Sequence, residues 1–365
     1  MISKFALIKP VAEDYLLNIA RRLPEKNNRG NITMDKIRVG LIGCGGRQNA
    51  HIDALLTMEN VAIVAVADPV EERRLAAMKK TGAQRAYENH TALYDKENEK
   101  TLDVLYISVE PTAHTDIETK AIDMGIPFLV EKPMTLDLEQ AEDIARRVKE
   151  KNLLTAVGFQ DRYLDLMDII KDELPRHKPG GLVNGVWIGG IPGVWWWQKR
   201  STCGGQLVEQ NIHLADGLRY LYGEPLSVYA VSSRGIVKPG VDASPEYDTD
   251  DYSVCIYRFD NNVTATLESG CYSQGVRPNC GLVIKLNDMV IDYRLRNNLI
   301  MTSEFKTVDI RRGNDQTLDM NRAFIHAVKT GDGSGIRSPY EDALKSLKMT
   351  FAANESMDTG KVIHF

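Results

Sequence analysis

The sequence predicts an α/β protein in which a doubly wound parallel sheet precedes a second α/β domain that is richer in strands. A chain of 365 residues exceeds the size at which one hydrophobic core keeps growing, so two domains are expected. Between residues 36 and 157, short apolar runs alternate with helical segments, which is typical of a parallel sheet covered on both faces. Between residues 158 and 365, strand patterns follow one another with short links, which indicates an antiparallel or mixed sheet.

The alternation in the first half starts from a β-branched strand that ends in glycines. A helix to about Glu59 follows, and the next strand leads into a helix that closes on Gly82, a residue suited to the left-handed backbone of a helix end. A further helix spans residues 114–124. The strand segments are KIRVGLIGCGG, VAIVAVADP, LDVLYISVEP, IPFLVEKP and LLTAVGF, with the helix LDLEQAEDIARRVKEKN before the last of them.

The second half opens with a helix near residues 164–174 and continues mainly as strands. Residues 260–262 and 287–288 have the Asn and Asp composition of hairpin turns. Two last helices, near 320–330 and 341–359, are expected to return and cover the sheet or the first domain. The expected strands are GLVNGVWIGG, LSVYAVSSR, DDYSVCIYRF, NVTATLESG, CGLVIKL and MVIDYRL.

Residues 1–35 are expected to form a separate N-terminal extension. Glu13 and Asp14 argue against a transit peptide, and the segment lacks the apolar core of a signal peptide. Met34 is a second candidate for the first residue of the native protein. No chemistry is expected from this stretch.

Composition narrows the class of protein. The formal net charge of −5 gives no electrostatic reason to expect nucleic acid or an anionic membrane as a partner. No apolar run approaches the roughly 20 residues that a membrane-spanning helix needs. Five cysteines without a secretory leader indicate free thiols in a reducing compartment, so a cytoplasmic location is expected. No CxxC pair and no HExxH motif is present, and no metal site is expected.

A glycine turn between the first strand and helix predicts a dinucleotide site. Gly43, Gly45 and Gly46 lie about 22 residues before Asp68, which ends the next strand. Glycines allow a pyrophosphate to approach the helix N-terminus, where unpaired N–H groups favour anions. Asp68 would accept hydrogen bonds from ribose hydroxyls and repel a 2′-phosphate, so NAD is preferred over NADP. The alternative is a tight turn beside a surface aspartate.

Two residues in this turn depart from the usual pattern. Gln48 occupies the usual third glycine position, so the strand and helix are expected to pack less closely there. Arg47 could reach a phosphate, which weakens the preference for NAD.

Lys132 follows a buried strand, at an edge of the sheet where ligands of such folds bind. Pro133 restricts Lys132 to extended conformations and so fixes the direction of its ammonium group. A lysine held there can hydrogen-bond a ribose hydroxyl and a substrate oxygen. Taken alone, such a lysine is more often a surface lysine after a strand.

The segment GGQLVEQNIHLADGLRYLYGE, residues 204–224, predicts a helix with one polar stripe. Glu209, His213, Asp216 and Tyr220 recur at spacings of four, three and four, within about 60° of one another on a helix. A solvated face, a metal site and an acid–base set all fit this spacing. In the last case His213 would accept the hydroxyl proton and a nearby carboxylate would orient its ring, while Lys132 would stabilise the developing alkoxide.

Two further segments suggest substrate contacts. Arg162 and Tyr163 lie just past the strand segment LLTAVGF and could bind substrate hydroxyls, with an interdomain salt bridge as the alternative. Trp196 lies in a run of three tryptophans, whose rings could stack on a sugar or form an oligomer contact. In YSVCIYRF both faces of the strand are apolar, which favours an oligomer.

These motifs together resemble the Gfo/Idh/MocA oxidoreductases, over nearly all of residues 36–365. The resemblance rests on IGCGG, AVADP, ISVEPTAH, LVEKP, VGFQDRY, GGQLVEQNIHLADGLRYLYGE and EDALKSLKMTFAANESMDTGK. It implies a Rossmann domain followed by an α/β domain whose open, mainly antiparallel sheet commonly forms homodimers or homotetramers. By resemblance Lys132 and His213 are the catalytic pair, Glu131 binds the nicotinamide ribose, Ser108 and His114 lie near the cofactor, Glu209 replaces the commoner aspartate, and Asn211 replaces a frequent glycine at the substrate.

The function implied is NAD-dependent oxidation or reduction of a sugar, cyclitol or related polyol. One alternative is an NAD-dependent glycosidase, in which transient oxidation permits elimination and NAD is regenerated. The other is a non-catalytic protein that senses nucleotides. The presence of both Lys132 and His213 argues against that last alternative.

Overall fold

The first sheet places the glycine turn and Lys132 at one edge. The computed structural model describes residues 36–275 and 278–365, so the expected extension and Met34 lie outside the described residues. The strand order is β3-β2-β1-β4-β5-β6, with every neighbouring pair parallel, and the predicted doubly wound sheet is confirmed. The strands are β1 (Ile37–Ile42), β2 (Val61–Ala67), β3 (Arg85–Tyr87), β4 (Val104–Ile107), β5 (Phe128–Val130) and β6 (Thr155–Val157).

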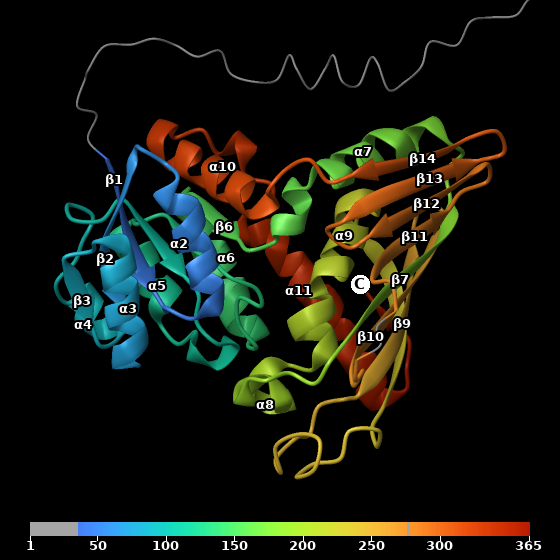
Figure 1. Ribbon diagram of the computed structural model, residues 1–365, viewed down its shortest axis with the longest axis horizontal. Helices are drawn as coiled ribbons and strands as arrows, with labels where there is room; N and C mark the ends of the chain where they lie inside the picture. Colours follow the sequence, from blue (N-terminus) through green and yellow to red (C-terminus); the bar gives the residue numbers. More distant parts are fainter. Residues whose placement is uncertain (1–35, 276–277) are drawn as a thin grey trace, which may run out of the picture. The chain divides into compact units, whose positions relative to one another are not determined.

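Helices cover this sheet because their apolar faces are matched to its apolar strands (Figure 1). In α6 the buried residues are Ala141, Ile144, Ala145 and Val148, the spacing of one helix face. The side chain of Asp137 caps this helix by accepting from two backbone N–H groups. The helices are α2 (Gly46–Leu56), α3 (Glu71–Thr81), α4 (His90–Tyr94), α5 (Ile117–Met124) and α6 (Leu138–Glu150).

The second sheet has the strand order β14-β13-β12-β11-β7-β10-β9-β8-β15. Only the pair of β7 and β10 is parallel, so the sheet is mainly antiparallel, as expected. The strands are β7 (Gly181–Gly189), β8 (Pro225–Ser233), β9 (Tyr252–Phe259), β10 (Val263–Cys271), β11 (Gly281–Lys285), β12 (Met289–Arg294), β13 (Asn298–Ser303), β14 (Thr307–Arg311) and β15 (Ile363–His364).

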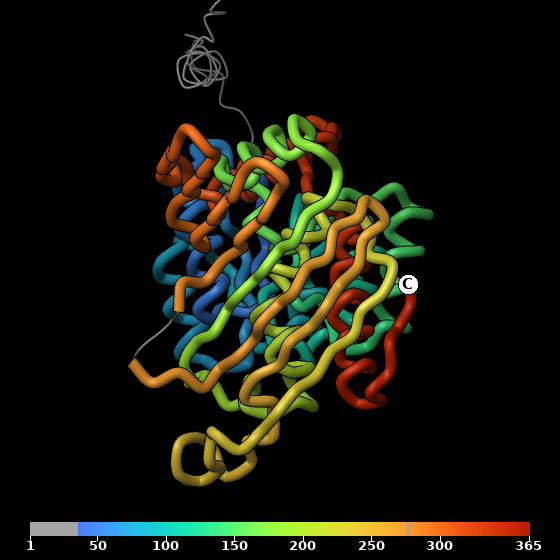
Figure 2. The backbone as a smooth tube through the Cα atoms, turned by 90° about the vertical axis from the view of Figure 1, so that its right-hand side faces the viewer, coloured from blue at the N-terminus to red at the C-terminus, as the bar shows by residue number. Residues whose placement is uncertain are grey.

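Helices cover one face of the second sheet, and Figure 2 looks onto the other face. In β9, Cys255 and Tyr257 point into the core, whereas Tyr252 and Ile256 are 37% and 41% exposed. The outer face is therefore open within one chain, although the sequence had suggested that both faces are covered. The helices of this half are α7 (Asp165–Glu173), α8 (Arg200–Cys203), α9 (Ile212–Tyr222), α10 (Gln316–Thr330) and α11 (Tyr340–Thr359).

The last two helices return to earlier parts of the chain: α10 packs against α2, and α11 packs against β6 of the first sheet and β8 of the second (Figure 1). Phe324 of α10 is buried against Tyr106 of β4, with ring centroids 6.0 Å apart. Leu347 of α11 belongs to the core of the first sheet, and Met349 to that of the second. The two sheets are thus joined through a shared helical layer. No helix in the described ranges is long and apolar enough to cross a membrane.

Candidate active site

The predicted motifs meet at the carboxyl edge of the first sheet. Gly43 follows β1, Ser108 follows β4, and Glu131 and Lys132 follow β5. The strand order reverses between β1 and β4, whose last residues pair with each other. Ligands of doubly wound sheets bind outside the strand ends at this point.

The glycine turn has the space and the donors that a pyrophosphate needs. Gly43 has φ +85°, and a Cβ there would collide with the carbonyl oxygen of Ser108. A Cβ on Gly45 or Gly46 would meet nothing within 4 Å, so the backbone is open to a ligand. Helix α2 starts at Gly46 without a side-chain cap and without an acidic residue in its first turn. Its first N–H groups therefore fit a phosphate group.

Asp68 is held in place at the end of β2. Its Oδ2 accepts from the backbone N–H of Cys44 at 2.7 Å, and its Oδ1 accepts from that of Val70 at 2.8 Å. Each oxygen has a second lone pair with which it can accept from a ribose hydroxyl. Gln48, at the usual third glycine position, is fully buried rather than turned towards solvent.

Glu131 is the centre of a buried polar network. Its Oε1 accepts from Arg47 Nε at 2.7 Å and lies 2.9 Å from His51 Nε2, and the other ring nitrogen of His51 lies 3.1 Å from Asn321 Oδ1. Burial alone would raise the pKa of Glu131, but Arg47 and His51 lower it to about 2. A Cβ on Gly158 would collide with this carboxylate. Arg47, which could reach a phosphate, donates its Nε–H to Glu131.

Lys132 is bound by the segment that precedes α9. Its Nζ donates to the backbone oxygen of Glu209 at 2.6 Å and to Glu209 Oε1 at 2.7 Å. An ammonium group has three N–H donors, so one remains for a ligand. Burial raises the pKa of Glu209 to about 7, against the lowering effect of Lys132.

A π-helical turn at Leu207–Asn211 splits the predicted polar stripe. In such a turn each residue rotates about the helix axis by less than the 100° of an α-helix. π-Helical turns are frequent at functional sites. Glu209 consequently points to Lys132, whereas Asp216 pairs with Arg162. A nearby carboxylate was expected to orient the ring of His213, but the Glu209 carboxylate hydrogen-bonds Lys132.

His213 lies between aromatic rings. It stacks on Trp187 with centroids 5.8 Å apart and meets the edge of Phe159 at 6.1 Å. Its Nδ1 is buried without a hydrogen-bond partner in the structure, 4.0 Å from Asp161 Oδ2. Burial, followed by three nearby cations, holds the pKa of His213 well below its ordinary value. The imidazole is therefore neutral near pH 7 and can accept a proton.

Three residues near His213 were not predicted from the sequence. Asp161 lies in the VGFQDRY motif, in which a role was assigned from the sequence to Arg162 and Tyr163 only. Trp187 is signalled only by strand alternation, which turns it to the helical side of β7. Arg296, in the turn between β12 and β13 with φ +56°, has no sequence pattern that marks it.

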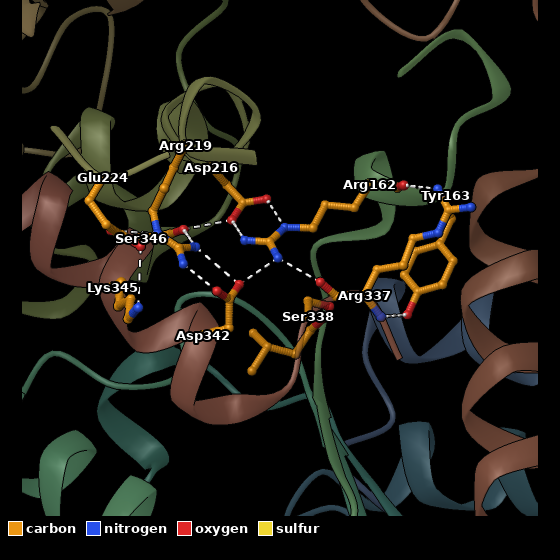
Figure 3. A network of polar contacts seen from close by, with 11 residues as sticks. Arg162, Tyr163, Asp216, Arg219, Glu224, Arg337, Ser338, Asp342, Lys345 and Ser346 are labelled. Carbon is orange, nitrogen blue, oxygen red and sulfur yellow. Dashed lines mark hydrogen bonds and ion pairs between the residues drawn. The ribbon is translucent and has the colours of Figure 1, made fainter. Parts of the chain in front are cut away.

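Arg162 and Tyr163 belong to a polar network between β6, α9 and α11, which corrects their assignment to substrate (Figure 3). Arg162 donates to both oxygens of Asp216, at 2.8 and 2.6 Å, and to Asp342 at 2.5 Å. The hydroxyl of Tyr163 accepts from the backbone N–H of Arg337 at 2.7 Å. The interdomain salt bridge is therefore the better interpretation of Arg162.

Replacing Arg162 with alanine is expected to lower the free energy of unfolding by about 3–5 kcal/mol, because Asp216 would remain buried without its cation. Denaturant titration followed by circular dichroism measures this change. The control Arg322→Ala removes an exposed pair with Asp319 and should cost less than about 1 kcal/mol. Equal costs for the two variants would contradict a structural role for the Arg162 network.

The other predicted site residues are placed as follows. The Oγ of Ser108 is buried without a partner in the described structure. His114 Nδ1 lies 2.6 Å from Glu118 Oε1, and its Nε2 is buried and unpartnered there. Asn211 donates to the backbone oxygen of Glu268 at 3.0 Å. Trp196 stacks on its neighbour Trp197, and no ring contact or hydrogen bond within the described residues joins it to Lys132 or His213.

The metal interpretation of the stripe is not supported by the geometry. Glu209 is paired with Lys132, and Asp216 is paired with Arg162. A metal ion would have to displace both of these basic side chains. No group of three His, Cys, Asp or Glu side chains within the described ranges is placed to hold a metal ion.

A doubly wound sheet with an open glycine turn, a second, mainly antiparallel sheet, and Lys132, Glu209 and His213 near one another are the features of a dinucleotide-binding oxidoreductase. The chain belongs to the Gfo/Idh/MocA oxidoreductase family. Residues 37–159 match the family model described as "Oxidoreductase family, NAD-binding Rossmann fold". Residues 183–285 match the "GFO/IDH/MocA C-terminal domain".

Known proteins resemble the chain at low identity. The rhizopine catabolism protein MocA of Rhizobium meliloti is 24% identical over 221 residues, 58% of this chain and 66%, just under two thirds, of that protein. Myo-inositol 2-dehydrogenase of Thermotoga maritima is 20% identical over 340 residues, 88% of this chain and 96% of that protein. The solved structure of levoglucosan dehydrogenase with NADH and levoglucosan has a TM-score of 0.80 at 19% identity, and the match covers 90% of this chain and 99% of that one. This last likeness shows a common fold.

Proposed function

We propose that the protein transfers a hydride between NAD and the CH–OH carbon of a sugar, cyclitol or related polyol. The observation that supports this most directly is the Lys132–Glu209 pair, in which Nζ and Oε1 are 2.7 Å apart. His213 lies near this pair, and burial, followed by nearby cations that include Lys132, holds its pKa well below the ordinary value. An ammonium donor and a neutral imidazole are the two groups that the oxidation of an alcohol requires from a protein. The relatives named myo-inositol 2-dehydrogenase and levoglucosan dehydrogenase agree with this class of reaction.

Each residue has a separate task in this proposal. NAD, when bound, supplies the acceptor for the hydride. Lys132 donates its remaining N–H to the substrate oxygen and stabilises the negative charge that develops there. His213 takes the hydroxyl proton, since its low pKa leaves it neutral. Glu209 is a positioning residue, because its backbone oxygen and its carboxylate both accept hydrogen bonds from Lys132.

NAD is the preferred cofactor. The carboxylate of Asp68 is fixed at the end of β2 by two backbone N–H groups, where it favours ribose hydroxyls and repels a 2′-phosphate. Arg47, the one residue that weakened this preference, uses its Nε on Glu131.

The experiment that tests the proposal is NADH absorbance with a library of sugars, cyclitols and polyols, using NAD and NADP in parallel. We expect NADH to form with at least one neutral polyol, and NAD to be used better than NADP. Release of sugar without net NADH would indicate the glycosidase alternative. Tight NADH binding without turnover of any compound would indicate the nucleotide sensor.

The open face of the second sheet is proposed to form a homodimer or homotetramer. The side chains of Tyr229, Val231, Tyr252 and Ile256 are 37–50% exposed on neighbouring strands, which is unusual for a face left to water.

All five cysteines are free thiols in the structure. They support the cytoplasmic location that we propose.

The rate of alcohol oxidation is expected to rise with pH through about 7. Below that value Glu209 is protonated, because its pKa is raised to about 7, and Lys132 then lacks its charged partner. This rise forms a limb of the pH profile near pH 7. His213 cannot produce the limb, because its low pKa leaves it neutral on both sides of pH 7. In Glu209→Gln the limb should disappear from the profile of kcat against pH, whereas Glu142→Gln, at an exposed pair with Lys348, should keep it. A limb near pH 7 that persists in Glu209→Gln would show that another group titrates.

A further inference from the structure

Three basic side chains surround the proposed reaction centre. Arg296, Lys132 and Arg47 all lie close enough to His213 to lower its pKa, in that order of effect after burial. The side chains of Arg296, Lys132 and Arg47 are 28%, 14% and 32% exposed to solvent, so a ligand can reach them. Such a group of cations would normally indicate a substrate with a carboxylate or phosphate group.

Every one of these cations already has its own carboxylate. The three acidic side chains are nearly buried, at 6–9% exposure. Each pair is joined by an N···O distance of 2.7 Å, so the positive charge is compensated within the protein. The pairs are Arg47–Glu131, Lys132–Glu209 and Arg296–Asp161.

The Arg296–Asp161 pair is the one next to His213 that no part of the proposed reaction uses. Arg296 donates through Nε and Nη2 to the two oxygens of Asp161, at 2.7 and 3.0 Å. Its guanidinium lies 5.4 Å from the ring centroid of Trp187, the same ring on which His213 stacks. In the described structure no bond from Arg296 Nη1 to the protein is present, so its two N–H donors are available to a ligand.

We infer that the protein takes uncharged polyols and that Asp161, by neutralising Arg296, excludes substrates with a carboxylate or phosphate near the reacting carbon. The free N–H groups of Arg296, in a pair without net charge, can then donate to a second substrate hydroxyl. The Asp161 oxygens can accept from the same hydroxyl. A hydroxyl group both donates and accepts, so it fits this pair, whereas an anion meets a carboxylate instead of a free cation. This inference rests on the proposed function and names its substrate class.

Calorimetric binding to the NADH complex tests the inference without turnover. The probes are glucose and myo-inositol, each compared with anionic counterparts: glucuronate and glucose 6-phosphate for the first, an inositol monophosphate for the second. In the wild type we expect at least one neutral compound to bind at least tenfold more tightly than its anionic counterparts. Tighter binding of the anionic compounds, or binding of none of them, would overturn the inference.

Two variants of opposite charge effect make the test sharper. Asp161→Asn keeps the shape but leaves Arg296 uncompensated, so the ratio of neutral to anionic affinity should fall at least tenfold. Arg296→Gln leaves Asp161 uncompensated, so the ratio should rise. Asp168→Asn breaks a similar pair with Arg337 and should leave the ratio unchanged. A ratio that does not respond to Asp161→Asn in a folded variant contradicts the role of Asp161.

Turnover separates this inference from the proposed function. NADH formation from an anionic compound with the wild-type protein, at higher kcat/KM than from any neutral one, would leave the function standing and reject the substrate class. Neutral compounds that bind selectively but never reduce NAD would support the substrate class and reject the proposed function.

Discussion

Replacing Lys132 with methionine is expected to lower kcat by about 10²- to 10³-fold while NADH still binds. Methionine is close to lysine in length but has neither the charge nor the N–H donors. In the wild type two of these donors go to Glu209, at 2.6 and 2.7 Å, which fixes the direction of Lys132. Its third donor is the one that we propose for the substrate oxygen. The loss falls on the transition state, where negative charge builds up on that oxygen.

The Lys132→Met experiment compares steady-state turnover with fluorescence titration of NADH. Lys96→Met, at an exposed lysine, is the matched control and should retain the activity of the wild type. A Lys132→Met enzyme that keeps more than a third of the wild-type kcat would remove Lys132 from the chemistry. Loss of NADH binding together with activity would instead give Lys132 a role in holding the cofactor.

Replacing His213 with asparagine is expected to lower kcat by about 10²- to 10⁴-fold, since the proton acceptor is lost. The neutral ring is held between Trp187 and Phe159, and the asparagine amide cannot accept a proton near neutral pH. The residual rate should then rise continuously with pH, because hydroxide in solution becomes the acceptor.

The His213→Asn variant is measured by the rate of NADH formation from pH 6 to pH 10, and NADH affinity is measured alongside. His326→Asn, at an exposed histidine of α10, is the matched control. A His213→Asn enzyme with the kcat and pH profile of the wild type would show that another group takes the proton.

Much of the fold could be predicted because apolar patterns determine it. Five of the six parallel strands, the glycine turn and the hairpin turns at 260–262 and 287–288 lie where local patterns put them. The short β3 and β15 and the strands β13 and β14 were not predicted. They are partly polar and partly exposed, so they show neither a continuous apolar run nor a clear alternation.

The site was predicted only where chemistry is local in sequence. Lys132 and His213 could be named because each lies in a motif, whereas the direction of Glu209 depends on a π-helical turn that a regular helix wheel does not represent. Asp161 and Arg296 are joined across 135 positions of the chain. Such a pair depends on tertiary packing between separate elements, which no local pattern contains.

Deuterium transfer tests the central claim most directly. A polyol that reduces NAD in the library screen is prepared with deuterium on the carbon that carries the reacting hydroxyl, and the nicotinamide product is analysed by mass spectrometry. We predict that the deuterium appears on the reduced nicotinamide ring in the wild type, and that its rate of appearance falls in Lys132→Met and His213→Asn. Deuterium that stays with the sugar or exchanges into water while NAD is consumed would contradict direct hydride transfer.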